Sequence, residues 1–298
     1  MSIAARSGPA TGPVTAPAAR PAYRHVKKRR TGWNVLGLVV AVIMAFPVYW
    51  MVITALRPSQ EILSYKQKLY PSSVTLAQFR RAIDMPNFWD NVKSSVIISV
   101  FSVVIAIGIG LLAAYALGRF RFWGRKGLMI TLLVVQLIPA TSMLIPIYIQ
   151  LNKAGGLNQY WGVIAVYSAT TLPFAVWMLR GFIVNIPREL EESAMVDGCS
   201  QMAAFRRVVL PLLAPGLVAA SIYALMTAWN EYLFAYVLLQ DNDKYTLSVW
   251  LLKFNTTRGT DYGALMAGSI LIALPVVVFF LFVQRKVASG LTAGAVKG

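Results

Sequence analysis

The sequence is poor in charge and nearly free of the side chains that build metal and catalytic centres. Only 13% of its 298 residues are charged, whereas soluble domains usually have about 25%. One cysteine, Cys199, excludes a disulfide within the chain and a cysteine-based metal site. One histidine, His25, leaves no histidine cluster for zinc or general-base chemistry, so no metal is expected. With 57% hydrophobic residues, these shortages indicate an integral membrane protein.

Nucleotide-binding and metalloprotease motifs are also missing. The chain has no Gly-x-x-x-x-Gly-Lys-Ser/Thr phosphate loop and no His-Glu-x-x-His. It therefore cannot hydrolyse ATP by a Walker mechanism, and no cofactor is expected in it. Acidic residues number 11 against 28 basic ones, giving a net charge of +17. The basic residues cluster beside apolar segments, so topology and membrane lipid explain them better than nucleic acid.

Long apolar segments dominate the rest of the sequence. Residues 1–30 are rich in small and proline residues and end in a basic run, which predicts a disordered basic cytoplasmic tail. The tail has no apolar region of signal-peptide type, so no cleaved leader is expected. Residues 31–298 are expected to form an all-α polytopic domain of six transmembrane helices, because a span needs roughly 20 apolar residues. The expected helices cover 33–56, 93–117, 128–150, 162–182, 214–238 and 263–284.

The distribution of Lys and Arg predicts the orientation of these helices. Eighteen of the 28 basic residues fall in the two termini, in the loops 118–127 and 183–213 and at Arg180 beside the second loop, and ten fall on the other side. The richer side is expected to be cytoplasmic. Both termini and the 183–213 loop would then lie inside. On the outer side, residues 75–83 are expected to form a short helix that packs over the spans.

The stretch 187–211 holds four of the 11 acidic residues. It predicts two short helices joined by a bend, with Pro187 at the first helical position and Gly198 in the left-handed conformation. Ser200 is expected to cap the second helix, which should stop before Pro211. An ordinary amphipathic loop between spans is the alternative reading. The acidic residues are Glu189, Glu191, Glu192 and Asp197.

The spacing within this stretch resembles the EAA loop of ABC importer permeases. That pattern is Glu-Ala-Ala, three residues, Gly, nine residues, Ile, one residue, Leu-Pro. Here Ser193 replaces the first Ala and Val208 replaces Ile. In that family the loop is a coupling helix that docks on a cytoplasmic ATPase subunit. The residues that the resemblance implies for ATPase coupling are Glu192, Ser193, Ala194, Asp197, Gly198, Leu210 and Pro211.

The fifth expected span contains Glu231, which is the only carboxylate well inside an apolar segment. A buried charge costs a few kcal/mol, so this residue is expected either to serve the translocation pathway or to make a structural hydrogen bond. The run from Trp229 to Phe234 resembles the Trp-Asn-Glu-Tyr/Phe-Leu-Phe motif of carbohydrate permeases. Pro139 and Pro146 are expected to interrupt the backbone of the third span. Polar residues in the third and fourth spans complete the candidate pathway surface, although helix packing explains them nearly as well. The pathway candidates are Asn230, Glu231, Gln136 and Thr171.

Together these motifs resemble carbohydrate ABC permeases of the maltose-permease type over roughly residues 33–298. The resemblance implies an ABC importer permease fold in a bacterial plasma membrane and a non-catalytic subunit of an ATP-driven sugar or oligosaccharide importer. The implied partners are a second, related permease subunit, two ATPase subunits that carry ATP and Mg²⁺, and an extracellular sugar-binding protein. The loop 239–262 would reach that binding protein.

Two other classes remain to be compared with this reading. An ion-gradient-driven secondary transporter is the main alternative, but a single intramembrane acid and no visible inverted repeat disfavour it. An intramembrane enzyme would need a pair of catalytic residues, and the expected spans contain none.

Overall fold

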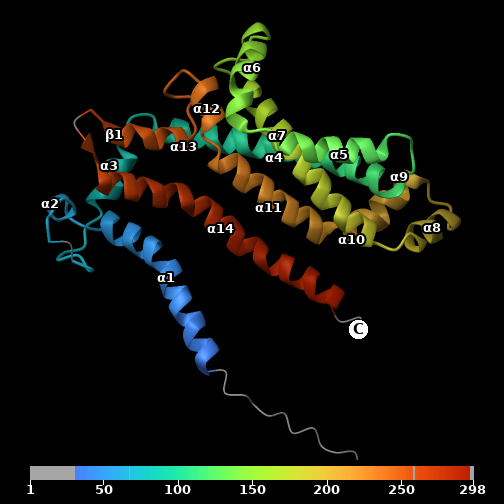
Figure 1. The fold of residues 1–298 in the computed structure, drawn as a ribbon, viewed down its shortest axis with the longest axis horizontal. Coiled ribbons are helices and arrows are strands. Elements are labelled where there is room, and N and C mark those ends of the chain that lie inside the picture. The colour runs from blue at the N-terminus through green and yellow to red at the C-terminus, as the bar shows by residue number, and fades with distance from the viewer. Residues whose placement is uncertain (1–30, 67, 258, 296–298) are drawn as a thin grey trace, which may run out of the picture. The chain divides into compact units, whose positions relative to one another are not determined.

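The computed structural model describes residues 31–66, 68–257 and 259–295 (Figure 1), with side chains described from 32 to 282. The expected tail, residues 1–30, lies outside the described residues. The α-helices are α1 (Thr31–Ala55), α2 (Ser59–Ile62), α3 (Ala77–Ile83), α4 (Phe88–Arg119), α5 (Arg125–Gln136), α6 (Ala140–Lys153), α7 (Tyr160–Asn185), α8 (Glu189–Val196), α9 (Gln201–Ala204), α10 (Leu210–Leu212), α11 (Ala214–Asn230), α12 (Leu233–Leu238), α13 (Leu247–Trp250) and α14 (Tyr262–Ala295). A π-helix, Phe205–Val209, joins α9 to α10, and a 3₁₀-helix, Leu251–Phe254, follows α13. The all-α prediction is confirmed, apart from one antiparallel pair of two-residue strands, β1 (Asn255–Thr256) and β2 (Gly259–Thr260).

The chain divides into two compact units at Pro47, a proline inside α1. In the first unit, the described side chains from 32 to 47 are all exposed, including large apolar ones such as Leu38 and Met44. A helix that is apolar on every side suits a lipid environment rather than water. The second unit runs from Val48 onward and contains all the packing described below.

Four described helices are long and apolar enough to cross a membrane, and two bent helix pairs would raise the number to six. The four match the expected spans over 33–56, 93–117, 162–182 and 263–284. They cover Gly32–Ala55, Phe88–Arg119, Tyr160–Asn185 and Tyr262–Phe282. The chain is therefore a polytopic helical membrane protein, but two of the expected spans are broken helices.

The expected span over 128–150 is two helices, α5 and α6, that bend by 100°. The break at residues 137–139 precedes α6, where Pro139 has no N–H to continue the ladder and restricts the residue before it. The sequence predicted an interrupted backbone here, which is confirmed. The expected span over 128–150 is therefore not one continuous helix.

The expected span over 214–238 is also broken, although it has no proline at the break. Helix α11 ends at Asn230, Glu231 is extended with φ −68° and ψ 128°, and α12 begins at Leu233. A second bend of 72° separates the Gln201–Leu212 helical stretch from α11. The prediction of one helix over 214–238 was therefore wrong.

Helices α4 and α7 pack along each other, and α11 packs against both. Small residues allow the close approach. A Cβ on Gly110 would lie 3.2 Å from the Cβ of Ala175 in α7, whereas a Cβ on Gly108 would meet nothing within 4 Å. Gly110, but not Gly108, therefore faces the helix contact.

The short helix expected over 75–83 is present as α3, and it packs against α14. Gln78 is fully buried, and its Nε2 donates to the Arg57 carbonyl at 2.8 Å. Arg81 forms a 3.1 Å ion pair with Asp261, at the start of α14. These contacts give α3 a structural role over the ends of the long helices.

Candidate functional site

The 187–211 segment has the predicted bend. Helix α8 is followed by Gly198, whose φ of +90° is a backbone conformation that favours glycine. The Ser200 hydroxyl then accepts a hydrogen bond from the Ala203 N–H at 3.3 Å, which caps α9 as expected. Both features are local in sequence, and both predictions are confirmed.

Two boundaries of the segment differ from the expectation. Helix α8 begins at Glu189, so Pro187 precedes the helix instead of occupying its first position. The second helix does not stop before Pro211 but continues through the π-helical turn into α10. In that turn the Leu210 N–H donates to the Phe205 carbonyl, five residues back. The wider turn changes the backbone register, and the helix passes through the proline.

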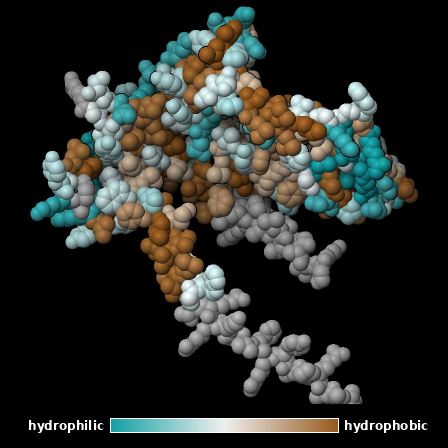
Figure 2. Space-filling view, in the orientation of Figure 1, coloured by the Kyte–Doolittle hydropathy of each residue, from teal (hydrophilic) through white to brown (hydrophobic). Residues whose placement is uncertain are grey.

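The expected coupling residues lie mostly on the surface of this segment. Figure 2 shows hydrophilic side chains gathered at its right, where Figure 1 places α8 and α9. Large apolar side chains are interspersed there, and Val196 is 87% exposed. The exposed candidates are Glu192, Ser193, Asp197, Gly198 and Pro211, and the half-buried ones are Ala194 and Leu210. The segment thus presents acidic and apolar side chains side by side.

Glu191 behaves differently from Glu192. Its carboxylate forms an ion pair with the Arg119 guanidinium, and the two side chains are only 9% and 7% exposed. The Tyr115 hydroxyl donates to the other carboxylate oxygen of Glu191 at 3.0 Å. The sequence contains no signal for this contact beyond the opposite charges of two loops 72 positions apart, so the contact was not predicted.

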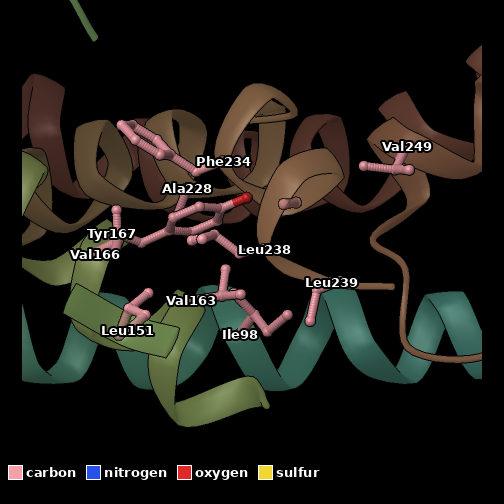
Figure 3. Close-up of a cluster of buried hydrophobic side chains, with 11 residues drawn as sticks. Ile98, Leu151, Val163, Val166, Tyr167, Ala228, Phe234, Leu238, Leu239 and Val249 are labelled. Atoms are coloured by element: carbon pink, nitrogen blue, oxygen red, sulfur yellow. The ribbon is translucent and has the colours of Figure 1, made fainter. Parts of the chain in front are cut away.

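Glu231 caps the helix that follows it. Its carboxylate accepts the N–H groups of Phe234 and Ala235 at 2.9 and 3.3 Å. The Tyr167 hydroxyl donates to the Glu231 carbonyl at 3.2 Å. Figure 3 shows Tyr167 lying among Ala228, Phe234 and Leu238, so α7 supports the break from one side. This geometry matches the structural hydrogen bond that the sequence left open as one of two roles.

The other pathway candidates lie on separate elements. Asn230 is exposed at the end of α11, and its Nδ2 donates to the Met226 carbonyl at 2.8 Å. Gln136 is the exposed last residue of α5. Thr171 is 3% exposed in α7, one turn beyond Tyr167. No hydrogen bond among the described residues joins any two of the four candidates.

The segment 239–246 is fastened to the turn before α7 by Asn158. The Asn158 Oδ1 accepts the N–H groups of Gln240 and Asp241 at 3.0 and 3.1 Å, and its Nδ2 donates to the Asp241 carboxylate at 2.6 Å. Lys244 forms a 3.0 Å ion pair with Asp241 and also donates to the Asn158 carbonyl. The hydrogen bond from Asn158, and then that from Lys244, lower the pKa of Asp241. The sequence did not single out Asn158.

Within the described ranges, no group of three or more His, Cys, Asp and Glu side chains gathers to hold a metal ion. The candidate site is defined instead by features of the backbone and its polar segments. Two breaks interrupt apolar helices, a bent polar segment stands at the end of α4, and a clamped polar loop stands by the start of α7.

Over 87% of this chain, the fold matches a bacterial ABC transporter involved in the import of the acidic polysaccharide alginate, with a TM-score of 0.74 and 20% identity, and the match covers 97% of that chain. Residues 106–292 match the model of the family "Binding-protein-dependent transport system inner membrane component". The chain belongs to this family, and it is a non-catalytic membrane component of a transport system.

Two relatives are similar over nearly their whole length. The diacetylchitobiose uptake system permease protein DasC of Streptomyces coelicolor is 43% identical over 265 residues, which are 89% of this chain and 96% of DasC. The trehalose transport system permease protein SugB of Mycobacterium tuberculosis is 35% identical over 274 residues, which are 91% of this chain and 99% of SugB.

Proposed function

We propose that the chain is a permease subunit of an ATP-driven importer of sugars or oligosaccharides in a bacterial plasma membrane. The 187–211 segment is the observation that carries the proposal. In this segment the motif spacing coincides with a bend at Gly198 and with a surface of exposed acidic and apolar side chains. Such a surface suits docking against a protein groove, in which apolar side chains supply buried area and charges supply orientation.

The substrate class rests on relatives. DasC and SugB are named for diacetylchitobiose and trehalose, which are different sugars. In this family a binding protein delivers the sugar, so the class carries over to this chain while the individual sugar is set elsewhere. We expect Asn230, Glu231, Gln136 and Thr171 to lie along the route, with Glu231 acting through the shape of the break that it caps.

The working assembly contains this chain, a second and related permease subunit, two ATPase subunits and a sugar-binding protein. Both termini and the 187–211 segment face the cytoplasm, where the ATPase subunits bind ATP and Mg²⁺. Closure of the ATPase pair moves the 187–211 segment, and the helices rock between inward-open and outward-open states. The clamped segment 239–246 faces outside and meets the sugar-binding protein.

The energy source separates this function from a secondary transporter. A strain that lacks this chain should lose uptake of at least one labelled sugar from a panel that includes diacetylchitobiose and trehalose. In the parent strain, depleting ATP with arsenate should abolish that uptake, and a protonophore applied while ATP is maintained should not. Uptake that survives ATP depletion as long as an ion gradient persists would establish the secondary transporter instead.

A further inference from the structure

The side of the 187–211 segment that faces the rest of the chain makes its own set of polar contacts. Of the acidic residues in α8, Glu191 is buried while Glu189 and Glu192 are exposed. Consecutive helical residues point about 100° apart, so Glu191 and Glu192 face different directions. The outer face is the one proposed above to meet an ATPase subunit. Glu191 faces the chain itself.

Glu191 contacts the last turn of α4 through charged and aromatic groups. Arg119, the last residue of α4, pairs with the Glu191 carboxylate, and its guanidinium also donates to the Ile186 carbonyl at 3.0 Å. Tyr115, one turn earlier, donates to the same carboxylate. Its ring also packs on Phe205 of the π-helical turn, with centroids 4.6 Å apart. Tyr115 thus contacts the segment on both sides of the Gly198 bend, and Arg119 contacts it before the bend.

Two further arginines close the end of α4. The last carbonyls of a helix have no partner within the helix, and positive charge is favoured there. The Arg188 guanidinium donates to the carbonyls of Gly118 and Arg119 at 3.4 and 3.2 Å. Arg180 of α7 donates to the Leu117 carbonyl at 3.4 Å. The end of α4 is therefore held by residues from α7 and from the 187–211 segment.

Because Arg119 and Glu191 are buried, separating their ion pair is costly. A buried pair that loses one partner leaves an uncompensated charge, which is far less favourable than the loss of a surface pair. The pair therefore resists separation while the segment moves. Because α4 packs along α7 and against α11, any movement of its end reaches the centre of the bundle.

We propose that Arg119, Glu191 and Tyr115 form a latch that makes the 187–211 segment and the last turn of α4 move as one body during transport. The proposal rests on the proposed function, in which an ATPase subunit displaces the segment. Glu191 and Arg119 are positioning residues in this account. They transmit displacement to the spanning helices and do not contact ATP or sugar.

Charge removal and charge exchange test the latch in the complex reconstituted with its ATPase and second permease subunits. The measured quantity is sugar transported per ATP hydrolysed, using the sugar identified in the uptake experiment. Arg119→Gln should lower this ratio by about tenfold or more, because it leaves Glu191 buried without its partner. The exchange Arg119→Glu with Glu191→Arg should restore a large part of it. Arg121→Gln removes the same charge from an exposed position two residues away and should leave the ratio unchanged.

A distance measurement in protein that keeps Arg119 and Glu191 covers the case in which Arg119→Gln fails to assemble. With Cys199 replaced by Ser, spin labels at Arg121→Cys and Met195→Cys report the separation of the α4 end and α8. The latch predicts the same peak distance with and without bound ATP. A shifted distance, or an unchanged sugar-to-ATP ratio in Arg119→Gln, would overturn the latch. A parent complex that transports no sugar with ATP would overturn the proposed function instead.

Discussion

Asn158 and Asp241 lie 83 positions apart in sequence, and the Asn158 amide donates to the Asp241 carboxylate at 2.6 Å. Asn158 has a φ of +57°, a left-handed conformation that asparagine tolerates better than most residues. The same side chain accepts the backbone N–H groups of Gln240 and Asp241. One residue therefore sets the shape of the 239–246 segment that we propose meets the binding protein.

Asn158→Gly should loosen this segment without straining the backbone, because glycine adopts the same φ. Loss of the side-chain hydrogen bonds should lower the free energy of local opening by about 1–2 kcal/mol. Hydrogen exchange at residues 239–246 should accelerate, and stimulation of ATP hydrolysis by the sugar-loaded binding protein should weaken. Asn158→Asp keeps both backbone contacts but opposes two carboxylates, so it should be at least as disruptive. Unchanged exchange in both variants would contradict the clamp.

The pKa of Asp241 predicts how acid affects the clamp. Its pKa lies below the ordinary value of 3.8 because Asn158, and next Lys244, hydrogen-bond to the charged form. A lowered folded-state pKa gives a contribution that is present above 3.8 and is lost as the pH falls through the lowered value. Exchange at 239–246, corrected for its intrinsic rate, should therefore be constant between about pH 8 and about pH 5. In Asn158→Gly, the acid-dependent change in exchange should be smaller than in the parent protein, because the largest cause of the lowered Asp241 pKa is removed.

Glu231→Ala should lower the thermal stability of the complex, because α12 loses the carboxylate that caps it. The loss of a capping side chain costs about 0.5–2 kcal/mol. Glu231→Gln keeps an acceptor oxygen and should be milder. Thermal unfolding and uptake per assembled complex should be measured together. Equal stability of Glu231→Ala and the parent would refute the capping role, whereas lost uptake in fully stable Glu231→Gln would favour a pathway role.

Gly198 tests the bend in the 187–211 segment. A Cβ placed there would meet nothing within 4 Å, so a substitution acts through the backbone alone. A non-glycine residue in the left-handed region costs roughly 1–2 kcal/mol, and a β-branched residue is the least tolerant. Gly198→Val should abolish transport while membrane insertion persists, and Gly198→Asn should retain more activity than Val. Normal uptake by Gly198→Val would contradict a coupling role for the bend.

Gly108 and Gly110 form a matched pair in α4. Gly110→Leu should destabilise the bundle by forcing α7 away, since even its Cβ would lie 3.2 Å from the Ala175 Cβ. Overpacking of this kind typically costs about 1–3 kcal/mol. Gly108→Leu makes the same change in helix propensity in open space and should leave the melting temperature nearly unchanged. Similar melting temperatures for the two variants would mean that the α4–α7 contact is looser than described.

The sequence predicted features whose causes are local. Apolar length located the unbroken spans, and the conformational freedom of Gly198 and the capping capacity of Ser200 fixed the bend in the 187–211 segment. Pro139 likewise indicated the interruption between α5 and α6. The break at Glu231 was not predicted, because the apolar character of the sequence continues across it. The Glu231 carboxylate reaches forward and accepts the first N–H groups of α12.

The tertiary contacts of Glu191 and Asn158 could not be predicted from the sequence. The coupling candidates were chosen by motif spacing, which selects Glu192 and its neighbours but does not say which way each side chain points. Glu191 pairs with Arg119 only because α7 returns the chain to the end of α4. The contacts of Asn158 also depend on the fold, since its side-chain partners follow it by more than 80 positions. Neither contact has a periodic or local signature.

The most direct test of the account is whether the exposed side of α8 meets an ATPase subunit. With Cys199 replaced by Ser, a cysteine at Val196, which is 87% exposed, should crosslink to an ATPase subunit in the assembled transporter. A cysteine at Gln240, in the segment clamped by Asn158, should not crosslink to it. The account predicts that a membrane-impermeant thiol reagent applied outside intact spheroplasts labels Gln240→Cys and leaves Val196→Cys unlabelled. Labelling of Val196→Cys from outside, together with no crosslink to an ATPase subunit, would contradict it.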